Sequence, residues 1–238
     1  MYKRLLISGG SGKFASEIIK QNTQYEIYAP TKQVMDVTSL DNVNEVVSNF
    51  KPDIFLHPAA LTRPMIKHIQ NPDQSININI IGTSNVCLAC MKSNVKLVYM
   101  STDYVYPGTE GNYKEEDALL PVNYYAWTKL GGECAVQLYE NSLILRTCMT
   151  ERPFVHEKAL VDSQKSLMYI DEAANICLQV LDEQGIINLG GEPTNSYDFI
   201  KNERPEVKKI YRKDILDVNM AIDSSMNLNK LQGILNEN

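Results

Sequence analysis

The residues best suited to chemistry in this chain are Tyr125 and Lys129, which lie four positions apart. A spacing of four places two side chains on one face of a helix, and residues 122–139 have a helical pattern. A free tyrosine has a pKa near ~10, too high for efficient proton transfer at neutral pH. A neighbouring ammonium favours the phenolate and lowers that pKa. The pair therefore predicts a tyrosine proton donor assisted by a lysine, and the adjacent Tyr124 lacks the spacing to Lys129.

Two hydroxyl residues, Ser101 and Thr102, follow an apolar run at residues 96–100. At the carboxyl end of a parallel strand, such side chains face the crevice in which cofactors bind. We expect Ser101 to line that crevice. We expect Thr102 to hydrogen-bond a substrate carbonyl oxygen while Tyr125 donates the proton. An ordinary Ser/Thr turn at a strand end is the structural alternative.

A glycine-rich turn follows the first apolar run and has the spacing G-x-x-G-x-x-A. Glycine permits unusual φ angles and close approach of a diphosphate, and the next helix offers free N–H groups to the phosphates. The motif alone is weak, but its place between a strand at residues 3–8 and a helix at residues 12–21 favours a dinucleotide. A phosphate-loop NTPase is disfavoured, because no Gly-Lys-Ser/Thr sequence follows the spacer. The cofactor contacts expected here are Gly9, Ser11, Gly12, Lys13 and Phe14.

The stretch after the second expected strand, residues 25–29, bears on the choice of cofactor. An NAD-specific site usually has an acidic residue here that binds the ribose 2′-hydroxyl group. This chain has no acid at residues 28–32, but it has Thr31 and Lys32, which could hold a 2′-phosphate. We therefore expect NADPH, with NADH as the alternative. A solvated surface lysine would explain Lys32 equally simply.

The elements that must position these residues alternate between short apolar runs and longer helical patterns, which is typical of a parallel sheet covered on both faces. We predict an α/β fold, a Rossmann-type doubly wound parallel sheet with a small C-terminal substrate-binding region. Residues 1–147 would form the dinucleotide-binding core, and residues 148–238 a reduced substrate-binding region that returns elements to the sheet. The expected strands cover residues 3–8, 25–29, 53–57, 96–101, 143–146 and 185–190. The expected helices cover residues 12–21, 39–50, 73–93, 122–139, 171–181, 196–202 and 227–235.

Composition narrows the functional class. The chain has 238 residues, a net charge of −6, and five cysteines scattered through apolar contexts. The charge disfavours nucleic-acid and anionic-membrane partners, and a reduced cytoplasmic chain explains the cysteines better than a disulfide framework does. Cys87 and Cys90 fall late in a helical pattern, which favours core packing over redox chemistry. We expect no metal site, because the three histidines lack ligand spacing, and no membrane span.

Taken together, these motifs resemble the extended short-chain dehydrogenase/reductases, and specifically the dTDP-4-dehydrorhamnose reductase-like (RmlD-like) family. The likeness runs from residue 3 to about residue 147 and returns weakly at residues 169–171, 188–191 and 223–231. It includes the glycine turn, Asp36-Val37-Thr38, Lys51-Pro52-Asp53, His57-Pro58-Ala59-Ala60, Asn79 with Gly82-Thr83, residues 101–106, Tyr113-x-Glu115-x-Asp117, Tyr125-x-x-x-Lys129-Leu130 and Leu145-Arg146-Thr147. No one of these motifs is specific, but together they are specific to the branch.

The resemblance implies roles for several residues. Thr102, Tyr125 and Lys129 would be the catalytic trio, with Lys129 also reaching the nicotinamide ribose. Asp36 and Val37 would flank the adenine, and Ala59, Ala60 and Asn79 would line the cofactor crevice. Asp103, Tyr104 and Arg63 would lie towards the substrate. In the related sugar-nucleotide dehydratases an acid follows Thr-Asp; Tyr104 occupies that place here, which disfavours dehydration.

The chain departs from the family pattern in two ways. The family usually continues Arg-Thr-Ser-Trp-Val-Tyr-Gly after the fifth strand, whereas this chain reads Arg146-Thr147-Cys148-Met149-Thr150-Glu151-Arg152. The chain is also shorter, and the missing length falls in the substrate-binding part. The cofactor chemistry is therefore better supported than the identity of the substrate.

The leading functional hypothesis is NADPH-dependent reduction of a nucleotide-linked 4-keto-6-deoxysugar. A nucleotide-sugar 4-epimerase would use the same trio. A non-catalytic, NADP-binding regulatory subunit is the third hypothesis, because the regulatory subunit of methionine adenosyltransferase resembles the same branch and the run Ala60-x-x-Arg63-Pro64 is similar to it. The expected partner is a nucleotide-sugar substrate, and a homodimer stays open.

Overall fold

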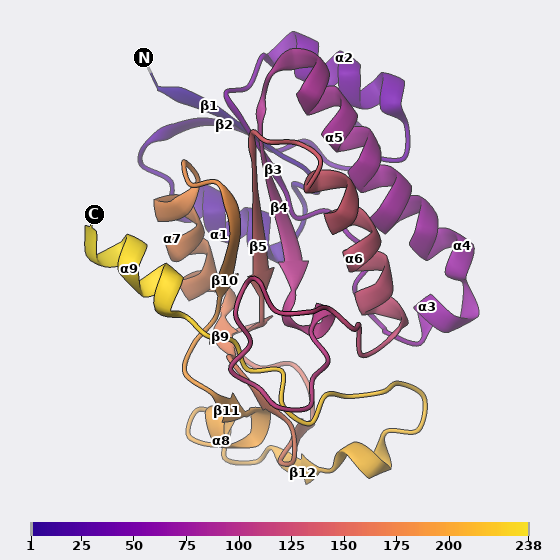
Figure 1. Ribbon diagram of the computed structural model, residues 1–238, viewed down its shortest axis with the longest axis vertical. Coiled ribbons are helices and arrows are strands. Elements are labelled where there is room, and N and C mark those ends of the chain that lie inside the picture. The colour runs from indigo at the N-terminus through magenta and orange to yellow at the C-terminus, as the bar shows by residue number, and fades with distance from the viewer. Residues whose placement is uncertain (1, 238) are drawn as a thin grey trace.

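The computed structural model describes residues 2–237, and six parallel strands form the central sheet of this part of the chain (Figure 1). Their spatial order is β10-β5-β4-β3-β1-β2. β3, β4 and β5 are buried along their whole length, as expected of a parallel sheet covered on both faces. The strands are β1 (Lys3–Ile7), β2 (Tyr25–Tyr28), β3 (Ile54–His57), β4 (Lys96–Thr102), β5 (Ser142–Thr147) and β10 (Gly185–Leu189).

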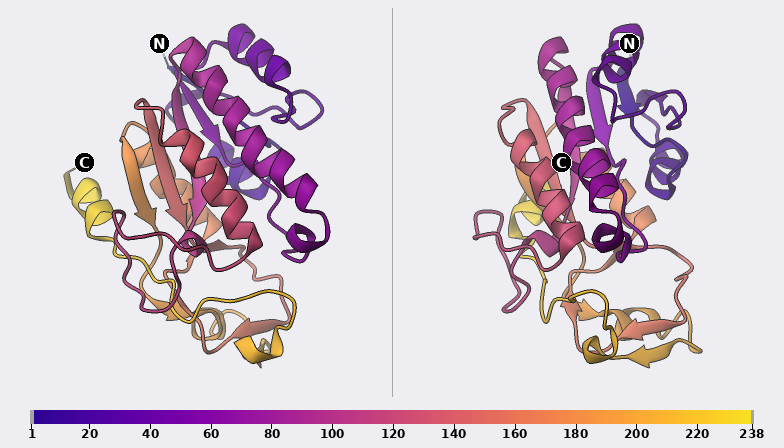
Figure 2. Two further views of the ribbon diagram at one scale, coloured as in Figure 1. Left: turned by 45° about the vertical axis from the view of Figure 1, so that its right-hand side comes forward. Right: turned by 90° about the vertical axis from the view of Figure 1, so that its right-hand side faces the viewer.

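Helices cover both faces of this sheet (Figure 2). One apolar cluster joins the sheet to α1 (Lys13–Gln21), α7 (Ile170–Val180) and α9 (Asn229–Glu237). A second cluster joins the opposite face to α2 (Leu40–Phe50) and α5 (Gly82–Ser93), against which α6 (Tyr124–Val136) packs. Cys87 and Cys90 are buried in this second cluster, which confirms the packing interpretation. The predicted doubly wound fold is therefore present.

One predicted helix has a different internal geometry. The pattern at residues 73–93 predicts one regular helix, but the structure has α4 (Pro72–Ser75), a π-helical turn η1 (Ile76–Ile81) and then α5. The extra residue of a π turn rotates the helical residues after it about the axis. Gly82 then packs so closely that an added Cβ would lie 2.8 Å from a Val37 methyl group. The short α3 (Lys67–Gln70) precedes this run.

After β5, α7, β10 and α9 return to the main body, whereas a smaller region lies below the carboxyl ends of the main strands, at the foot of Figure 1. Its small strand pairs are β6 (Met149–Thr150) with β9 (Met168–Tyr169), β7 (Lys158–Leu160) with β12 (Lys208–Ile210), and β8 (Gln164–Lys165) with β11 (Thr194–Asn195). It also contains α8 (Ser196–Ile200) and the 3₁₀ turn η3 (Arg212–Asp214). Strands of two or three residues carry no readable alternation, so these pairs were not predicted.

Candidate functional site

The site begins at the switch point of the sheet, where the chain leaves β1 for β2 on one side and later returns to β3 on the other. In open α/β sheets the crevice at such a point is where ligands bind. Ser8, just after β1, fastens the end of β3: its Oγ lies 2.8 Å from His57 Nδ1 and accepts a 3.1 Å hydrogen bond from the Ala59 N–H. The segment with Ala59 and Ala60 is thereby held beside the glycine turn.

The glycine turn fits a diphosphate. Gly9 has φ +64°, and an added Cβ at Gly10 would lie 1.9 Å from the Ala29 carbonyl oxygen, so a side chain cannot be accommodated there without a shift. The cap of α1 is Gly12, which offers no side-chain acceptor, and the first turn of α1 holds no acidic residue. The positive end of the helix is therefore open to an anion.

The predicted cofactor residues around this turn have different surroundings. The side chains of Ser11, Lys13, Thr31 and Lys32 are exposed, whereas the Phe14 ring is buried in the core, so Phe14 would meet a phosphate only through its backbone N–H. Their contacts with a cofactor stay predictions.

The adenine-side residues are also ordered. Asp36 Oδ1 accepts hydrogen bonds from Thr38 N at 3.0 Å and Thr38 Oγ1 at 2.8 Å. Burial raises the pKa of Asp36, but these bonds and the Lys32 charge outweigh it and hold that pKa below its usual value. Val37 is buried against Gly82. The Asp36 carboxylate therefore remains a hydrogen-bond acceptor near Lys32, the residue predicted to bind a 2′-phosphate.

Asn79 positions a loop in this structure. On the π turn, its Oδ1 accepts from Leu61 N at 2.7 Å, and its Nδ2 donates to Leu61 O at 2.9 Å and to Thr128 Oγ1 at 2.8 Å. These bonds tie the segment after β3 to α6. Asn79 thus holds the residue that follows Ala60, and the contacts of Ala59, Ala60 and Asn79 with a cofactor stay predictions.

Tyr125 lies on the first turn of α6, where Asn123 caps the helix by accepting a 3.0 Å hydrogen bond from Ala126 N. The Tyr125 ring packs 5.2 Å, between centroids, from the buried His68. Burial first, and then the negative charge of Asp103, raise the pKa of Tyr125, while Arg63 acts in the opposite direction. The pKa of Tyr125 is therefore raised, whereas the sequence predicted that Lys129 would lower it, because burial outweighs any effect of the lysine.

Lys129, one helical turn further, is buried, and its Nζ lies 4.2 Å from the centroid of the Tyr99 ring. Burial lowers the pKa of Lys129 to about 7, with Glu133 opposing this change. Its charge acts on His57, whereas Tyr125 is acted on by Asp103, Arg63 and Tyr104. The expected assistance of Tyr125 by Lys129 stays a prediction.

The hydroxyl groups of Ser101 and Thr102, at the end of β4, have different hydrogen-bond partners. Thr102 Oγ1 donates to Asp103 Oδ1 at 3.1 Å and accepts from Tyr104 N at 3.3 Å, which caps the 3₁₀ turn η2 (Asp103–Val105). Ser101 Oγ points elsewhere and donates to Glu133 Oε2 at 2.7 Å. Thr102 and Tyr104 are thus brought to the Tyr125 side, while Ser101 supports a buried ion pair.

Three residues of the C-terminal region that the sequence analysis did not single out contact the surroundings of Tyr125: Lys165, Ala221 and Ser224. Tyr104, Ala126 and Ala221 form an apolar cluster against which Tyr125 packs. The Asp103 carboxylate also accepts a 2.6 Å hydrogen bond from Ser224, and the Tyr104 hydroxyl accepts one from Lys165. Lys165 lies in a two-residue strand, so neither periodicity nor spacing distinguishes it from a surface lysine.

Arg63 was expected near the substrate. In the structure it forms an ion pair with Glu151, a residue to which the sequence analysis gave no role. Glu151 lies 3.0 Å from Arg63 and 3.2 Å from Lys13. Lys13 begins α1 and Arg63 follows β3, so Glu151 joins the start of α1 to the segment after β3.

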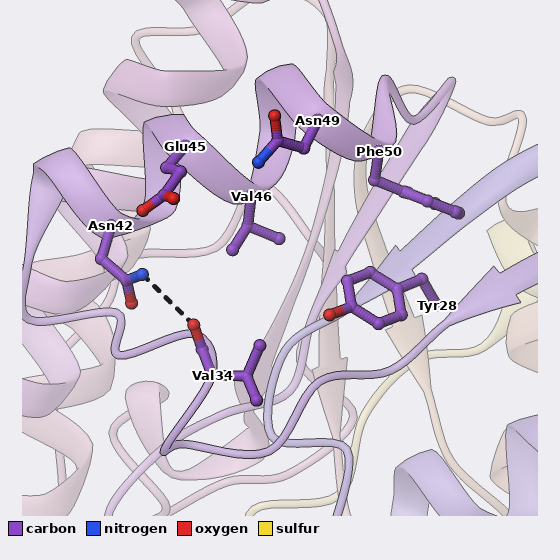
Figure 3. Close-up of a pocket in the computed structure, with 7 residues that line it drawn as sticks. All are labelled: Tyr28, Val34, Asn42, Glu45, Val46, Asn49 and Phe50. Carbon is purple, nitrogen blue, oxygen red and sulfur yellow. Dashed lines mark hydrogen bonds between the residues drawn. The ribbon is translucent and has the colours of Figure 1, made fainter.

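Two hollows lie in the surface of the described residues, and only one of them has a residue that also packs beside Tyr125. The one in Figure 3 lies between α2 and β2, where Asn42 Nδ2 donates to Val34 O at 3.2 Å, and it includes none of the predicted site residues. A second is lined by Arg212, Lys213 and Met220 among others, and Met220 also packs in the cluster beside Tyr125. In residues 2–237 no cluster of His, Cys, Asp or Glu could hold a metal ion. No helix of that part is long and apolar enough to cross a bilayer.

Comparison with known proteins places this geometry in context. Residues 3–152 match the model of the family described as RmlD substrate binding domain. A dTDP-4-dehydrorhamnose reductase of Aggregatibacter actinomycetemcomitans is 28% identical, over 82% of this chain and 76% of the relative. A methionine adenosyltransferase 2 subunit beta of Pongo abelii is 31% identical, over 59% of this chain and 44% of that subunit, so this match spans less than half of the subunit's length.

Among solved structures, a dTDP-4-dehydrorhamnose reductase from Bacillus anthracis in complex with NADP is similar in fold. The TM-score is 0.86, with 24% identity over 99% of this chain and 92% of the other. A Thermus thermophilus UDP-glucose 4-epimerase complex with NAD has a TM-score of 0.76 at 18% identity, over 97% of this chain and 92% of the other. These likenesses confirm the Rossmann-type fold, and the family match confirms the resemblance inferred from the motifs.

Proposed function

The chain belongs to the RmlD substrate-binding domain family, and on that premise we propose that it is an NADPH-dependent reductase of a nucleotide-linked 4-keto-6-deoxysugar. The observation that carries the proposal is the position of Tyr125 on the first turn of α6, one helical turn before the buried Lys129 and packed in the apolar cluster with Tyr104, which follows the end of β4. The reductase from Aggregatibacter actinomycetemcomitans supports the reaction class.

Each of the reactive residues has a distinct task in this reaction. The cofactor would supply the hydride that adds to C4 of the sugar. Tyr125 donates its phenolic proton to the oxygen that becomes negative. Thr102 turns its hydroxyl from Asp103 towards that oxygen and orients it. The pKa of Lys129 is about 7, so a bound group with negative charge or several hydroxyls would raise that pKa and favour the charged form.

The C-terminal region would hold the nucleotide part of the substrate. The hollow is lined by Arg212 and Lys213, by Asp162, which lies 3.6 Å from Arg212, and by Met220, which also packs in the cluster beside Tyr125. A diphosphate would bind Lys213 and compete with Asp162 for Arg212. With this arrangement, the sugar would reach from the hollow towards Tyr125.

The proposal is tested by adding an enzymatically prepared dTDP- or UDP-4-keto-6-deoxysugar and following NADPH oxidation, with NADH in parallel. Tyr125→Phe should lower turnover about 100-fold or more, because it removes the general acid. Tyr124→Phe is the matched control, since Tyr124 is exposed on the same helix, and it should retain wild-type turnover. Full turnover in Tyr125→Phe would refute the proposal.

A regulatory subunit is the second candidate, favoured by the similarity to methionine adenosyltransferase 2 subunit beta. In that case NADPH binds but no keto sugar is reduced, and the chain changes the rate of S-adenosylmethionine formation by a catalytic methionine adenosyltransferase. A 4-epimerase would instead retain tightly bound NAD through purification and interconvert sugars without net NADPH oxidation.

A further inference from the structure

A histidine that the proposed reaction does not use packs on Tyr125. His68 lies in the short helix α3 and is 1% exposed. The centroid of its imidazole ring is 5.2 Å from the centroid of the Tyr125 ring, and the two ring planes are inclined by 54°. Tilted rings at this separation attract each other. The contact therefore joins α3 directly to the tyrosine that we propose as the proton donor.

The His68 side chain is held by packing. Neither of its ring nitrogens is in hydrogen-bond geometry with a polar atom of residues 2–237. Burial lowers the pKa of His68, and the nearby Thr62 backbone opposes this effect without overcoming it. The ring is therefore neutral at neutral pH, and it meets Tyr125 as a flat, uncharged surface.

The segment that carries His68 is itself anchored. The Asn79 side chain accepts from Leu61 N at 2.7 Å and donates to Leu61 O at 2.9 Å. The Arg63 guanidinium is held in an ion pair. The carbonyl oxygen of Met65 accepts a 3.1 Å hydrogen bond from His68 N, and the Met65 side chain packs in the apolar cluster beside the tyrosine. The imidazole is thus presented from a fixed backbone.

A second part of the chain contacts the same tyrosine. Tyr104 and Ala221 belong to the apolar cluster against which Tyr125 packs. A proton donor works only when it is held close to its productive geometry, and a phenol ring can turn about two side-chain bonds. The contacts from α3 and from this cluster both restrict that rotation.

We propose that His68 is a positioning residue, whose imidazole ring packs on Tyr125 and holds the phenol ring in the orientation from which it donates its proton. The catalytic part of this inference rests on the proposed reductase function. Without a ring at position 68, the phenol gains rotational freedom and contact with water, and its hydroxyl group leaves the productive geometry more often. Phenylalanine supplies a flat ring without the nitrogens, so it should replace the histidine in this role.

The first experiment uses the wild-type protein without substrate. Nuclear Overhauser contacts are recorded between the ring protons of His68 and those of Tyr125, with the signals assigned by their loss in His68→Phe and Tyr125→Phe. We expect contacts between the two rings, because they pack together in the structure. Their absence would overturn the proposal, and this measurement does not depend on whether a variant at position 68 folds.

The second experiment follows the ionisation of the Tyr125 phenol through its ¹³Cζ signal up to about pH 10. Burial raises the pKa of Tyr125. Removal of the ring that covers it in His68→Ala admits water, so its pKa should fall towards ~10. His68→Phe should keep the wild-type behaviour, and so should the control Ile69→Ala, which shortens an exposed side chain of the same helix. An unchanged Tyr125 titration in His68→Ala would overturn the proposal.

The third experiment uses the keto-sugar reduction. His68→Ala should lower kcat about tenfold or more, with the dissociation constant for NADPH unchanged, whereas His68→Phe and Ile69→Ala should keep the wild-type kcat. A merely structural histidine would lower the folded fraction and leave kcat per folded molecule unchanged, and that result would overturn the inference. A His68→Phe variant as slow as His68→Ala would do so too. If the wild type reduces no keto sugar, the reductase proposal fails, while the two NMR experiments still test His68.

Discussion

The ammonium nitrogen of Lys129 lies 4.2 Å from the centroid of the Tyr99 ring, and the Tyr99 hydroxyl donates a 3.0 Å hydrogen bond to the Lys129 carbonyl oxygen. The two residues therefore fix each other by a cation–π contact and a hydrogen bond. The lysine that we propose to be catalytic is therefore shielded from water, and its burial has a measurable consequence.

Lys129 should make the stability of the protein depend on pH above neutrality. Its pKa is lowered by burial to about 7, so from about pH 7 to about pH 10 the unfolded lysine binds a proton that the folded one releases. The free energy of unfolding should rise with pH in this window, by up to roughly 1.4 kcal/mol per pH unit from this group. Urea unfolding of the wild type and Lys129→Met should show this rise in the wild type alone. The exposed Lys92→Met is the control, and parallel profiles for Lys129→Met would mean that the ammonium is well solvated.

The buried ion pair of Glu133 and Arg146 should dominate the stability of the region behind the site. Their side chains are 0% and 2% exposed, and Glu133 Oε1 lies 2.5 Å from Arg146 Nη2. Glu133→Ala leaves the guanidinium buried without its partner, and we expect a loss of about 3–5 kcal/mol in urea unfolding. Asp198→Ala, which breaks the exposed pair with Lys201, is the matched control and should change little. A small loss in Glu133→Ala would show that water reaches Arg146.

Glu151 should weaken cofactor binding. Its carboxylate pairs with Lys13 and Arg63 across the crevice, so an incoming diphosphate must compete with it. Glu151→Gln should tighten NADPH binding roughly two- to fivefold, because the two cations of these ion pairs are largely exposed to solvent. Calorimetric titration measures this, with Glu206→Gln at the exposed pair with Arg204 as the control. Weaker binding in Glu151→Gln would assign Glu151 a supporting role instead.

Lys32 should select NADPH over NADH. The Lys32 side chain is exposed after β2, where a 2′-phosphate is expected. Lys32→Ala should raise the dissociation constant for NADPH about tenfold, because a charge-assisted hydrogen bond is lost, and should leave that for NADH unchanged. Lys92→Ala controls for net charge. An equal loss for both cofactors would argue against a 2′-phosphate contact.

The sequence by itself determined the doubly wound sheet, the glycine turn and the Tyr125–Lys129 pair. These features are local: a buried strand, a tight turn and a four-residue helical spacing each arise from residues close together in the chain. The predicted 73–93 helix is interrupted by the π turn at η1, which is followed at once by the close packing of Gly82 on Val37, a contact between residues distant in the chain that a helical period does not reveal.

Only the tertiary structure decided which groups surround the reactive residues. Lys129 faces Tyr99, Thr102 hydrogen-bonds Asp103, and Asp103 and Tyr104 receive Ser224 and Lys165 from the C-terminal region. Ser224 is 121 residues from Asp103 along the chain, and no spacing rule spans such a separation. The pKa values that govern the proposed chemistry depend on burial and on distant charges, and both arise only when the sheet and the C-terminal region come together.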